Sequence, residues 1–215
     1  MVHARCAIVV LISGSGSNLQ ALIDDSAAAD AGYEISAVIA NNPDAYGLQR
    51  AASANIPTGV VNHRDFDSRE AFDQALAAAV ESYHPKLVVL AGFMRILTRE
   101  FVSRFSGRMV NIHPSLLPKF PGINTHQRAL DAGETEHGVS VHFVTEDLDG
   151  GPIIDQESVP ILPGDDAAAL QQRVLAIEHI IYPRVVRWFA AKRLRMEDNH
   201  AILDGKPLAI GTNRG

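Results

Sequence analysis

The sequence has little of what marks a secreted, membrane-bound or metal-dependent protein. Its single cysteine, Cys6, has no second thiol for an internal disulfide or a zinc site, and its apolar neighbours predict a buried, unreactive thiol. No apolar run approaches the roughly 18 residues of a membrane span. The start, MVHARCAIVVLISG, lacks the separate apolar core and cleavage site of a signal peptide. We therefore expect a cytoplasmic protein with no membrane partner.

Basic residues are also in the minority. There are 19 Lys and Arg against 25 Asp and Glu, a net charge of -6, which argues against nucleic acid as the main partner. The histidines show no metal-binding spacing such as HExxH, so we predict no metal. The 215 residues can bury a substantial core, and no linker or repeat divides them. We expect a single domain over residues 1–215.

Apolar runs alternate with helical patterns along the first half of the chain. Uninterrupted runs such as LVVLA are typical of strands buried on both faces, as in a parallel sheet covered by helices. The expected strands are residues 7–12, 35–40, 58–61, 87–91 and 109–110, and the expected helices are 19–23, 46–54, 67–83 and a helix from about 98.

The second half predicts an addition to this sheet. Strand patterns at 139–144 and 153–161 are separated by a turn with Asp149-Gly150-Gly151, as expected of antiparallel neighbours. Helices are expected at 125–132 and 165–190. The predicted fold class is α/β: a Rossmann-like, mostly parallel sheet flanked by helices, with an antiparallel addition in the C-terminal half.

A turn rich in serine and glycine, GSGSN, joins the first strand to the first helix. The dinucleotide pattern GxGxxG would need a small residue where the chain has Leu19, and no Walker lysine follows. Two interpretations stay open. The bare backbone N–H groups at the helix N-terminus suit a single phosphate monoester, but such a turn is also often only a helix cap.

The stretch MVNIHPSLLPKFPG, residues 109–122, is the most informative. Because alternate residues of a strand share a face, Asn111 and His113 should point the same way, with Ile112 turned into the core. The prolines that follow predict a rigid connection. An amide donor beside a titratable imidazole suits a carbonyl that becomes an oxyanion.

Asp149, in its Gly-Gly-Pro turn, is the natural partner of His113, because a carboxylate could orient the ring and stabilise its protonated form. The alternative is a turn residue that only binds its own backbone. We interpret His142 as a satisfied core or strand residue, and His126 and His137 as helix-end or surface groups. Taken alone, Glu178 and His179 read as a solvated helix face.

These motifs resemble those of the folate-dependent formyltransferases. NIHPSLLP together with DGGP indicates that class, and GSGSN with FMRIL and EHIIYP narrows the resemblance to the phosphoribosylglycinamide formyltransferases. The resemblance implies that residues 1–108 are mainly nucleotide-binding and 109–215 catalytic and folate-binding. The implied catalytic group is Asn111, His113 and Asp149.

The resemblance also implies two binding regions. The ribonucleotide would be held by Gly16, Ser17, Asn18 and Leu19, with Glu178 at its amine end. The folate pocket would be formed by Arg69, Met94, Arg95, Ile96, Leu97, Asn111, Thr145, Glu146, Asp147, Leu148 and Asp149.

The implied reaction is formyl transfer from 10-formyltetrahydrofolate to the amine of 5-phosphoribosylglycinamide, in de novo purine synthesis. Asn111 and protonated His113 would stabilise the tetrahedral oxyanion, and Asp149 would keep His113 charged. No Ser or Cys is placed beside the histidine, so no covalent enzyme intermediate is expected. The expected partners are these two small molecules, and the resemblance permits a homodimer without requiring one.

Two rival functions remain at this point. One is another formyl-handling enzyme, either a formyltetrahydrofolate hydrolase or a methionyl-tRNA formyltransferase; their families carry a further domain for which we expect no room here. The other is a non-catalytic nucleotide-binding module that uses only the GSGSN turn. Such a module would not need Asn111, His113 and Asp149 to converge.

Overall fold

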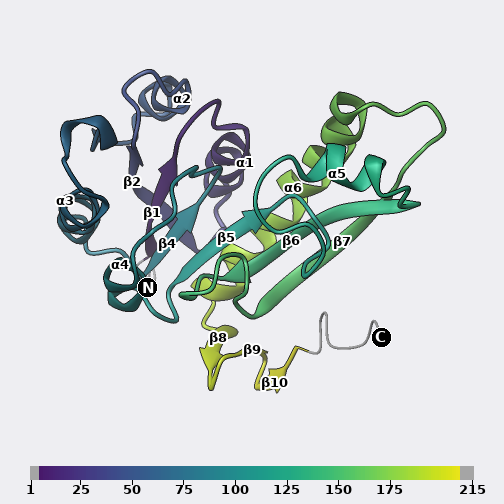
Figure 1. The fold of residues 1–215 in the computed structure, drawn as a ribbon. Helices are drawn as coiled ribbons and strands as arrows, with labels where there is room; N and C mark the ends of the chain where they lie inside the picture. The colour runs from purple at the N-terminus through teal and green to yellow at the C-terminus, as the bar shows by residue number, and fades with distance from the viewer. Residues whose placement is uncertain (1–4, 209–215) are drawn as a thin grey trace.

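The computed structural model describes residues 5–208, which form a seven-stranded sheet with helices on both faces and a separate three-stranded sheet (Figure 1). The large sheet contains β1 (Cys6–Ile12), β2 (Tyr33–Ala40), β3 (Thr58–Val60), β4 (Leu87–Leu90), β5 (Met109–His113), β6 (Glu136–Phe143) and β7 (Ile153–Pro160). The helices are α1 (Ser17–Ser26), α2 (Gly47–Ser53), the 3-10 helix η1 (His63–Asp65), α3 (Arg69–Glu81), α4 (Arg99–Arg104), α5 (Thr125–Asp131) and α6 (Ala167–Ala190).

The strand order is β3-β2-β1-β4-β5-β6-β7. The first five strands are parallel to their neighbours, whereas β6 runs antiparallel to β5 and β7 antiparallel to β6. The predicted fold class is therefore confirmed, including the antiparallel addition. The small sheet, β8 (Leu194–Glu197), β9 (His200–Leu203) and β10 (Lys206–Pro207), follows α6.

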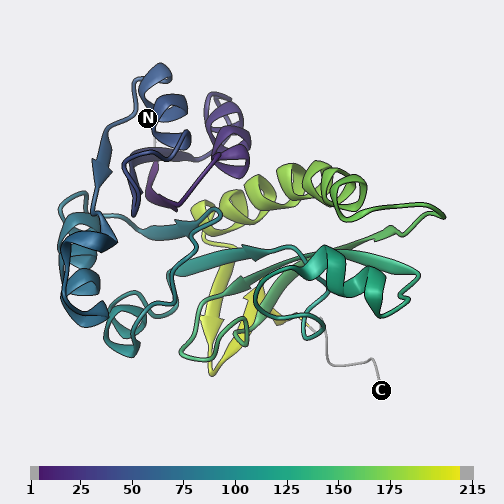
Figure 2. The same cartoon turned by 45° about the horizontal axis from the view of Figure 1, so that its top comes forward.

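The large sheet has a hydrophobic core on each face. Val10 of β1 packs with residues of α1, α2 and α6 on one side, and Leu11 packs with residues of α3 and α4 on the other. This alternation explains why β1 is apolar throughout. Figure 2 shows α6 lying across the face of β5 to β7. The buried Tyr182 hydroxyl of α6 donates to the carbonyl oxygen of Leu90 over 2.7 Å, which ties the helix to the middle of the sheet.

The helices predicted at 67–83, from about 98 and at 165–190 are observed within two residues of their expected starts, and each has a side-chain cap. The side chain of Ser68 accepts from Ala71 N–H at the start of α3, and Asp166 accepts from Ala169 N–H at the start of α6. Thr98 caps α4 in the same way. Between residues 5 and 208, no helix combines the length and apolar character needed to cross a bilayer.

Candidate active site

A cleft of about 560 Å³ opens where β1, β4 and β5 end, and it is lined by residues that directly follow each strand. Ser13 follows β1, Ala91 follows β4, and His113 closes β5. In parallel sheets ligands bind at the carboxyl ends of the strands, where the connections leave the sheet on opposite faces. The position alone therefore makes this cleft the candidate site.

The GSGSN turn forms one end of the cleft. Gly16 has φ 69°, a left-handed conformation that favours glycine, and it packs so closely on Gly47 that an added Cβ would lie 2.7 Å from the Gly47 Cα. The turn is fixed further by the bond from Gly47 N–H to the Gly14 carbonyl oxygen, 3.0 Å. Ser17 and Asn18 then begin α1 at the cleft wall. Backbone N–H groups of the first helical turn thus lie beside open space, as an anion site requires.

Asn111 and His113 both line the cleft from β5, as their spacing predicts. His113 Nδ1 lies 3.5 Å from Asp149 Oδ2, and the His113 and Asp149 side chains are only 7% and 9% exposed. On its other side, His113 Nε2 lies 2.9 Å from the Phe120 carbonyl oxygen. Because a carbonyl only accepts, Nε2 carries a hydrogen, and Nδ1 is the ring nitrogen that faces Asp149.

Asp149 is held in place by a second contact. Its Oδ2 accepts from Gly122 N–H over 2.8 Å, which joins the turn after β6 to the proline-rich connection after β5. Asp149 itself has φ 52°, a conformation that aspartate tolerates better than most residues. The alternative reading of Asp149, as a residue that binds only its own turn, is therefore wrong. Asp149, from the turn after β6, therefore converges with Asn111 and His113 of β5.

Glu178 lies at the opposite wall of the cleft. It is 7% exposed, and its Oε2 accepts from Asn18 Nδ2 over 2.6 Å. The interpretation of Glu178 as part of a solvated helix face is wrong, because the first turn of α1 covers it. Burial raises the pKa of this carboxyl group, and the bond from Asn18 opposes that shift.

Comparison with known proteins agrees with this geometry. A family model described as formyl transferase matches residues 6–186. Phosphoribosylglycinamide formyltransferase of Escherichia coli (strain K12) is 54% identical over 201 residues, which cover 94% of this chain and 95% of that protein. A solved structure of phosphoribosylglycinamide formyltransferase from Coxiella burnetii is 58% identical, has a TM-score of 0.92, and is matched over 96% of this chain and 97% of that chain. This chain belongs to the formyl transferase family.

The relationship extends to larger proteins. The human trifunctional purine biosynthetic protein adenosine-3 is 46% identical over 198 residues, which are 92% of this chain but 20% of that protein. The resemblance that the sequence motifs indicated is confirmed.

In this formyl transferase the predicted folate segments border the cleft. Met94, Arg95 and Ile96 line it, and Leu148 faces it from the turn after β6. A smaller hollow of about 110 Å³ adjoins the cleft and shares Asn111 and Asp149 with it. Leu97, Thr145, Glu146 and Asp147 line this hollow.

Two predicted binding residues lie elsewhere. Arg69 is exposed at the first position of α3 and does not line the cleft or the adjoining hollow. Leu19 is 0% exposed in the core, so its side chain is unavailable to a ligand. Arg69 nevertheless lies near the buried Asp73, which accepts from Thr98 N–H and so fixes the end of the segment that contains Met94.

One of the three histidines differs from its interpretation. His137 is a strand residue of β6 with 1% exposure, so its reading as a helix-end or surface group is wrong. Its ring packs edge-on against His126, with centroids 5.1 Å apart. Burial lowers the pKa of both rings, that of His137 to about 4, so both are neutral near pH 7. His126 lies at the start of α5, as predicted, and lines the cleft. The interpretation of His142 as a core or strand residue is confirmed, since it is buried on β6, and its Nε2 lies 3.1 Å from Asn111 Nδ2.

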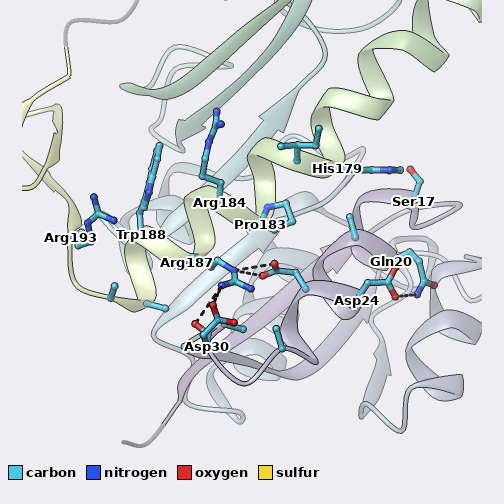
Figure 3. Close-up of a pocket in the computed structure, with 18 residues that line it drawn as sticks. Ser17, Gln20, Asp24, Asp30, His179, Pro183, Arg184, Arg187, Trp188 and Arg193 are labelled. Atoms are coloured by element: carbon cyan, nitrogen blue, oxygen red, sulfur yellow. Dashed lines mark hydrogen bonds and ion pairs between the residues drawn. The ribbon is translucent and has the colours of Figure 1, made fainter.

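A larger hollow, about 960 Å³, lies between α1 and α6 away from these groups (Figure 3). Its arginines are paired: Arg187 contacts Asp25 at 2.9 Å and Asp30 at 3.2 Å, and Arg193 contacts Asp204 at 2.6 Å. The Arg187–Asp25 pair joins α6 to α1, so these charges serve the packing of the fold. Size alone therefore does not make this hollow the active site. Among residues 5–208 there is no group of three or more His, Cys, Asp or Glu side chains that could hold a metal ion.

Proposed function

We propose that this formyl transferase moves the formyl group of 10-formyltetrahydrofolate to the amine of 5-phosphoribosylglycinamide, giving formylglycinamide ribonucleotide and tetrahydrofolate. The observation that carries the proposal is the convergence of Asn111, His113 and Asp149 at the end of β5, inside a cleft with two distinct ends. The full-length similarity to proteins named phosphoribosylglycinamide formyltransferase supports the choice of substrates. A non-catalytic nucleotide-binding module would not require this convergence.

The chemistry takes place at the formyl carbon. The neutral amine attacks it, a C–N bond forms, and the carbonyl oxygen becomes an oxyanion. An Asn111 N–H and protonated His113 Nδ1 donate to that oxygen, and Asp149 stabilises the imidazolium from 3.5 Å. When the intermediate collapses, the bond to the folate nitrogen breaks, and that nitrogen receives the proton that the attacking amine loses. A single well-placed donor to an oxyanion contributes about 10²–10³ in rate.

The two ends of the cleft suit the two substrates. The GSGSN turn offers N–H groups to the phosphate of the ribonucleotide, and buried Glu178 lies at the same wall for its amine end. The apolar side chains of Met94, Ile96 and Leu148 are 66%, 59% and 59% exposed, which suits a flat heterocycle such as folate. Holding both substrates together supplies much of the expected rate.

The proposal also includes the cellular location, the binding partners and the oligomeric state of the enzyme. We place the enzyme in the cytoplasm because the relatives are biosynthetic enzymes. The two substrates are the proposed partners, and a homodimer stays a prediction that sedimentation of the purified chain would check.

The test is an absorbance assay for the folate product, run with and without 5-phosphoribosylglycinamide. Product that depends on the ribonucleotide supports the transferase. Product formed equally well without it indicates a hydrolase, and no turnover in either case favours the binding module. His113→Asn should reduce kcat by roughly 10²–10⁴ while the chain stays folded by circular dichroism. Near-normal turnover of that variant would remove His113 from the mechanism.

A further inference from the structure

His142 occupies an unusual place for a polar side chain. It lies on β6 directly opposite Asn111 of β5 in the antiparallel register, and it is 2% exposed. A buried imidazole needs partners for both ring nitrogens, because an unsatisfied buried polar group is costly. The identity of those partners fixes where its proton lies.

The first partner settles the tautomer. His142 Nδ1 lies 2.8 Å from the carbonyl oxygen of Phe143. A carbonyl oxygen only accepts, so Nδ1 must carry the hydrogen. In a neutral ring this leaves Nε2 with a lone pair and no hydrogen.

The second partner is then Asn111. Its Nδ2 lies 3.1 Å from His142 Nε2, within hydrogen-bond distance, whereas Asp149 Oδ1 is 3.8 Å from the same atom and too far for such a bond. The charged or titratable groups facing the ring are Asp149 and His113. Burial lowers the pKa of His142, and this effect is larger than the opposing effects of the Phe143 carbonyl and of Asp149. The ring is therefore neutral, and Nε2 accepts from Asn111.

This bond decides which way the Asn111 amide faces. One hydrogen of Nδ2 is given to His142, and the second is left for a ligand in the cleft. Were the ring protonated at Nε2, the amide would turn over to present its oxygen to His142. The amide nitrogen would then be swung away from the position it now holds.

We propose that His142 is a positioning residue, which holds the Asn111 amide with its second N–H available to the formyl oxygen. This inference rests on the proposed function, because it concerns the residue that orients Asn111, the oxyanion donor of that reaction. Preorganised donors stabilise a transition state because they need no reorganisation when the charge develops. A residue that served only to fill the core would affect turnover without any coupling to Asn111.

The test is a double-mutant cycle of wild type, Asn111→Ala, His142→Phe and the double variant. His142→Phe keeps the ring volume but removes the acceptor. It should reduce kcat by roughly tenfold or more, with KM for both substrates changed less than about threefold. In the Asn111→Ala background the same change should alter kcat by less than about twofold, since no amide remains to be held. Equal losses in both backgrounds would overturn the proposal.

Two further measurements keep the outcome decisive if His142→Phe folds poorly. His142→Gln can present an amide oxygen close to the Nε2 position, so it should recover most of the activity; a loss as large as that of His142→Phe would contradict the proposal. In the wild type, ¹⁵N-resolved NMR of the histidine rings should give the neutral Nδ1–H tautomer for His142 at pH 7.5. A hydrogen on Nε2 would overturn the proposal whether or not the chain has transferase activity, so its failure is distinct from failure of the proposed function.

Discussion

Asn18 and Glu178 are joined by a hydrogen bond of 2.6 Å although 160 residues separate them in the sequence. The bond connects the first turn of α1 to the middle of α6 at the wall of the cleft. It satisfies one oxygen of a carboxylate that burial has removed from water, and burial raises the pKa of that carboxyl group. A group placed at such a cost is expected to serve the ligand more than the fold.

The first prediction concerns Glu178→Gln. A carboxyl pKa raised on folding means that the folded state holds a proton that the unfolded state has released. The contribution of Glu178 to the free energy of unfolding is therefore most favourable below about pH 4.5 and falls as the pH rises through the folded pKa. Glutamine stays neutral and can accept the same bond from Asn18. The variant should therefore melt higher at pH 7.5, by about 2–4 °C for each kcal/mol gained.

In the same variant, KM for 5-phosphoribosylglycinamide should rise, because the charge beside the amine is lost. Thermal melts at pH 7.5 and near pH 4.5 check the stability effect, which should shrink at the lower pH. Glu197→Gln is the control; it removes only an exposed ion pair with Arg195 on β8, so it should leave KM unchanged and should not raise the melting temperature at pH 7.5. A lower melting temperature for Glu178→Gln at pH 7.5 would contradict the account.

A second prediction concerns acid stability. Burial, and then the neighbouring His126, lower the pKa of His137 from 6.5 to about 4. The unfolded chain therefore binds a proton that the folded chain excludes, so the stabilisation is complete above about pH 6.5 and is lost as the pH falls towards 4. His137→Gln should lose less stability over this range, by up to about 3 kcal/mol. Urea unfolding at pH 7.5 and pH 5 measures this, with the exposed His200→Gln as control. Equal acid sensitivity of His137→Gln and wild type would disprove it.

The sequence predicted most of the sheet, because its signals are local. Strands β1 and β4 are apolar throughout since both of their faces are covered, and the caps at Ser68 and Asp166 are set by residues within one helical turn. The shared direction of Asn111 and His113 was also predictable from a local signal, because alternate residues of one strand lie on the same face.

The sequence did not reveal contacts between residues that are far apart in the chain. Glu178 read as solvated because nothing near it in sequence reveals that Asn18 covers it. His142 is the core or strand residue that was expected, but its contact with Asn111 comes from the register of β6 on β5, which no local pattern gives. The motif resemblance supplied Glu178 but neither His142 nor the burial of His137.

A third prediction separates the α1–α6 hollow from catalysis. Arg187 of α6 is paired with Asp25 and Asp30 on the α1 side of the hollow (Figure 3). Arg187→Met should destabilise the chain by about 1–3 kcal/mol, because it leaves the partly buried Asp25 without its cation. Its kcat should stay within about twofold of wild type, since these groups lie outside the cleft. Arg195→Met removes an exposed pair with Glu197 and should cost less than about 1 kcal/mol. A large loss of kcat in folded Arg187→Met would show that the hollow is coupled to turnover.

The last prediction tests how tightly Asp149 must be held. A Cβ added to Gly151 would collide with the carbonyl oxygen of Phe143 and lie 3.2 Å from Thr145 Cγ2, so Gly151→Ala must displace the turn that contains Asp149. Asp149 Oδ2 is 3.5 Å from His113 Nδ1 and 2.8 Å from Gly122 N, and both distances should change with the turn. A displacement of about 1 Å at a catalytic group lowers kcat by roughly 10- to 100-fold. Gly59→Ala is the matched control, because its Cβ would meet only Ile39 Cγ1 at an ordinary 3.7 Å. If folded Gly151→Ala turned over as fast as Gly59→Ala, the position of Asp149 would not limit the reaction.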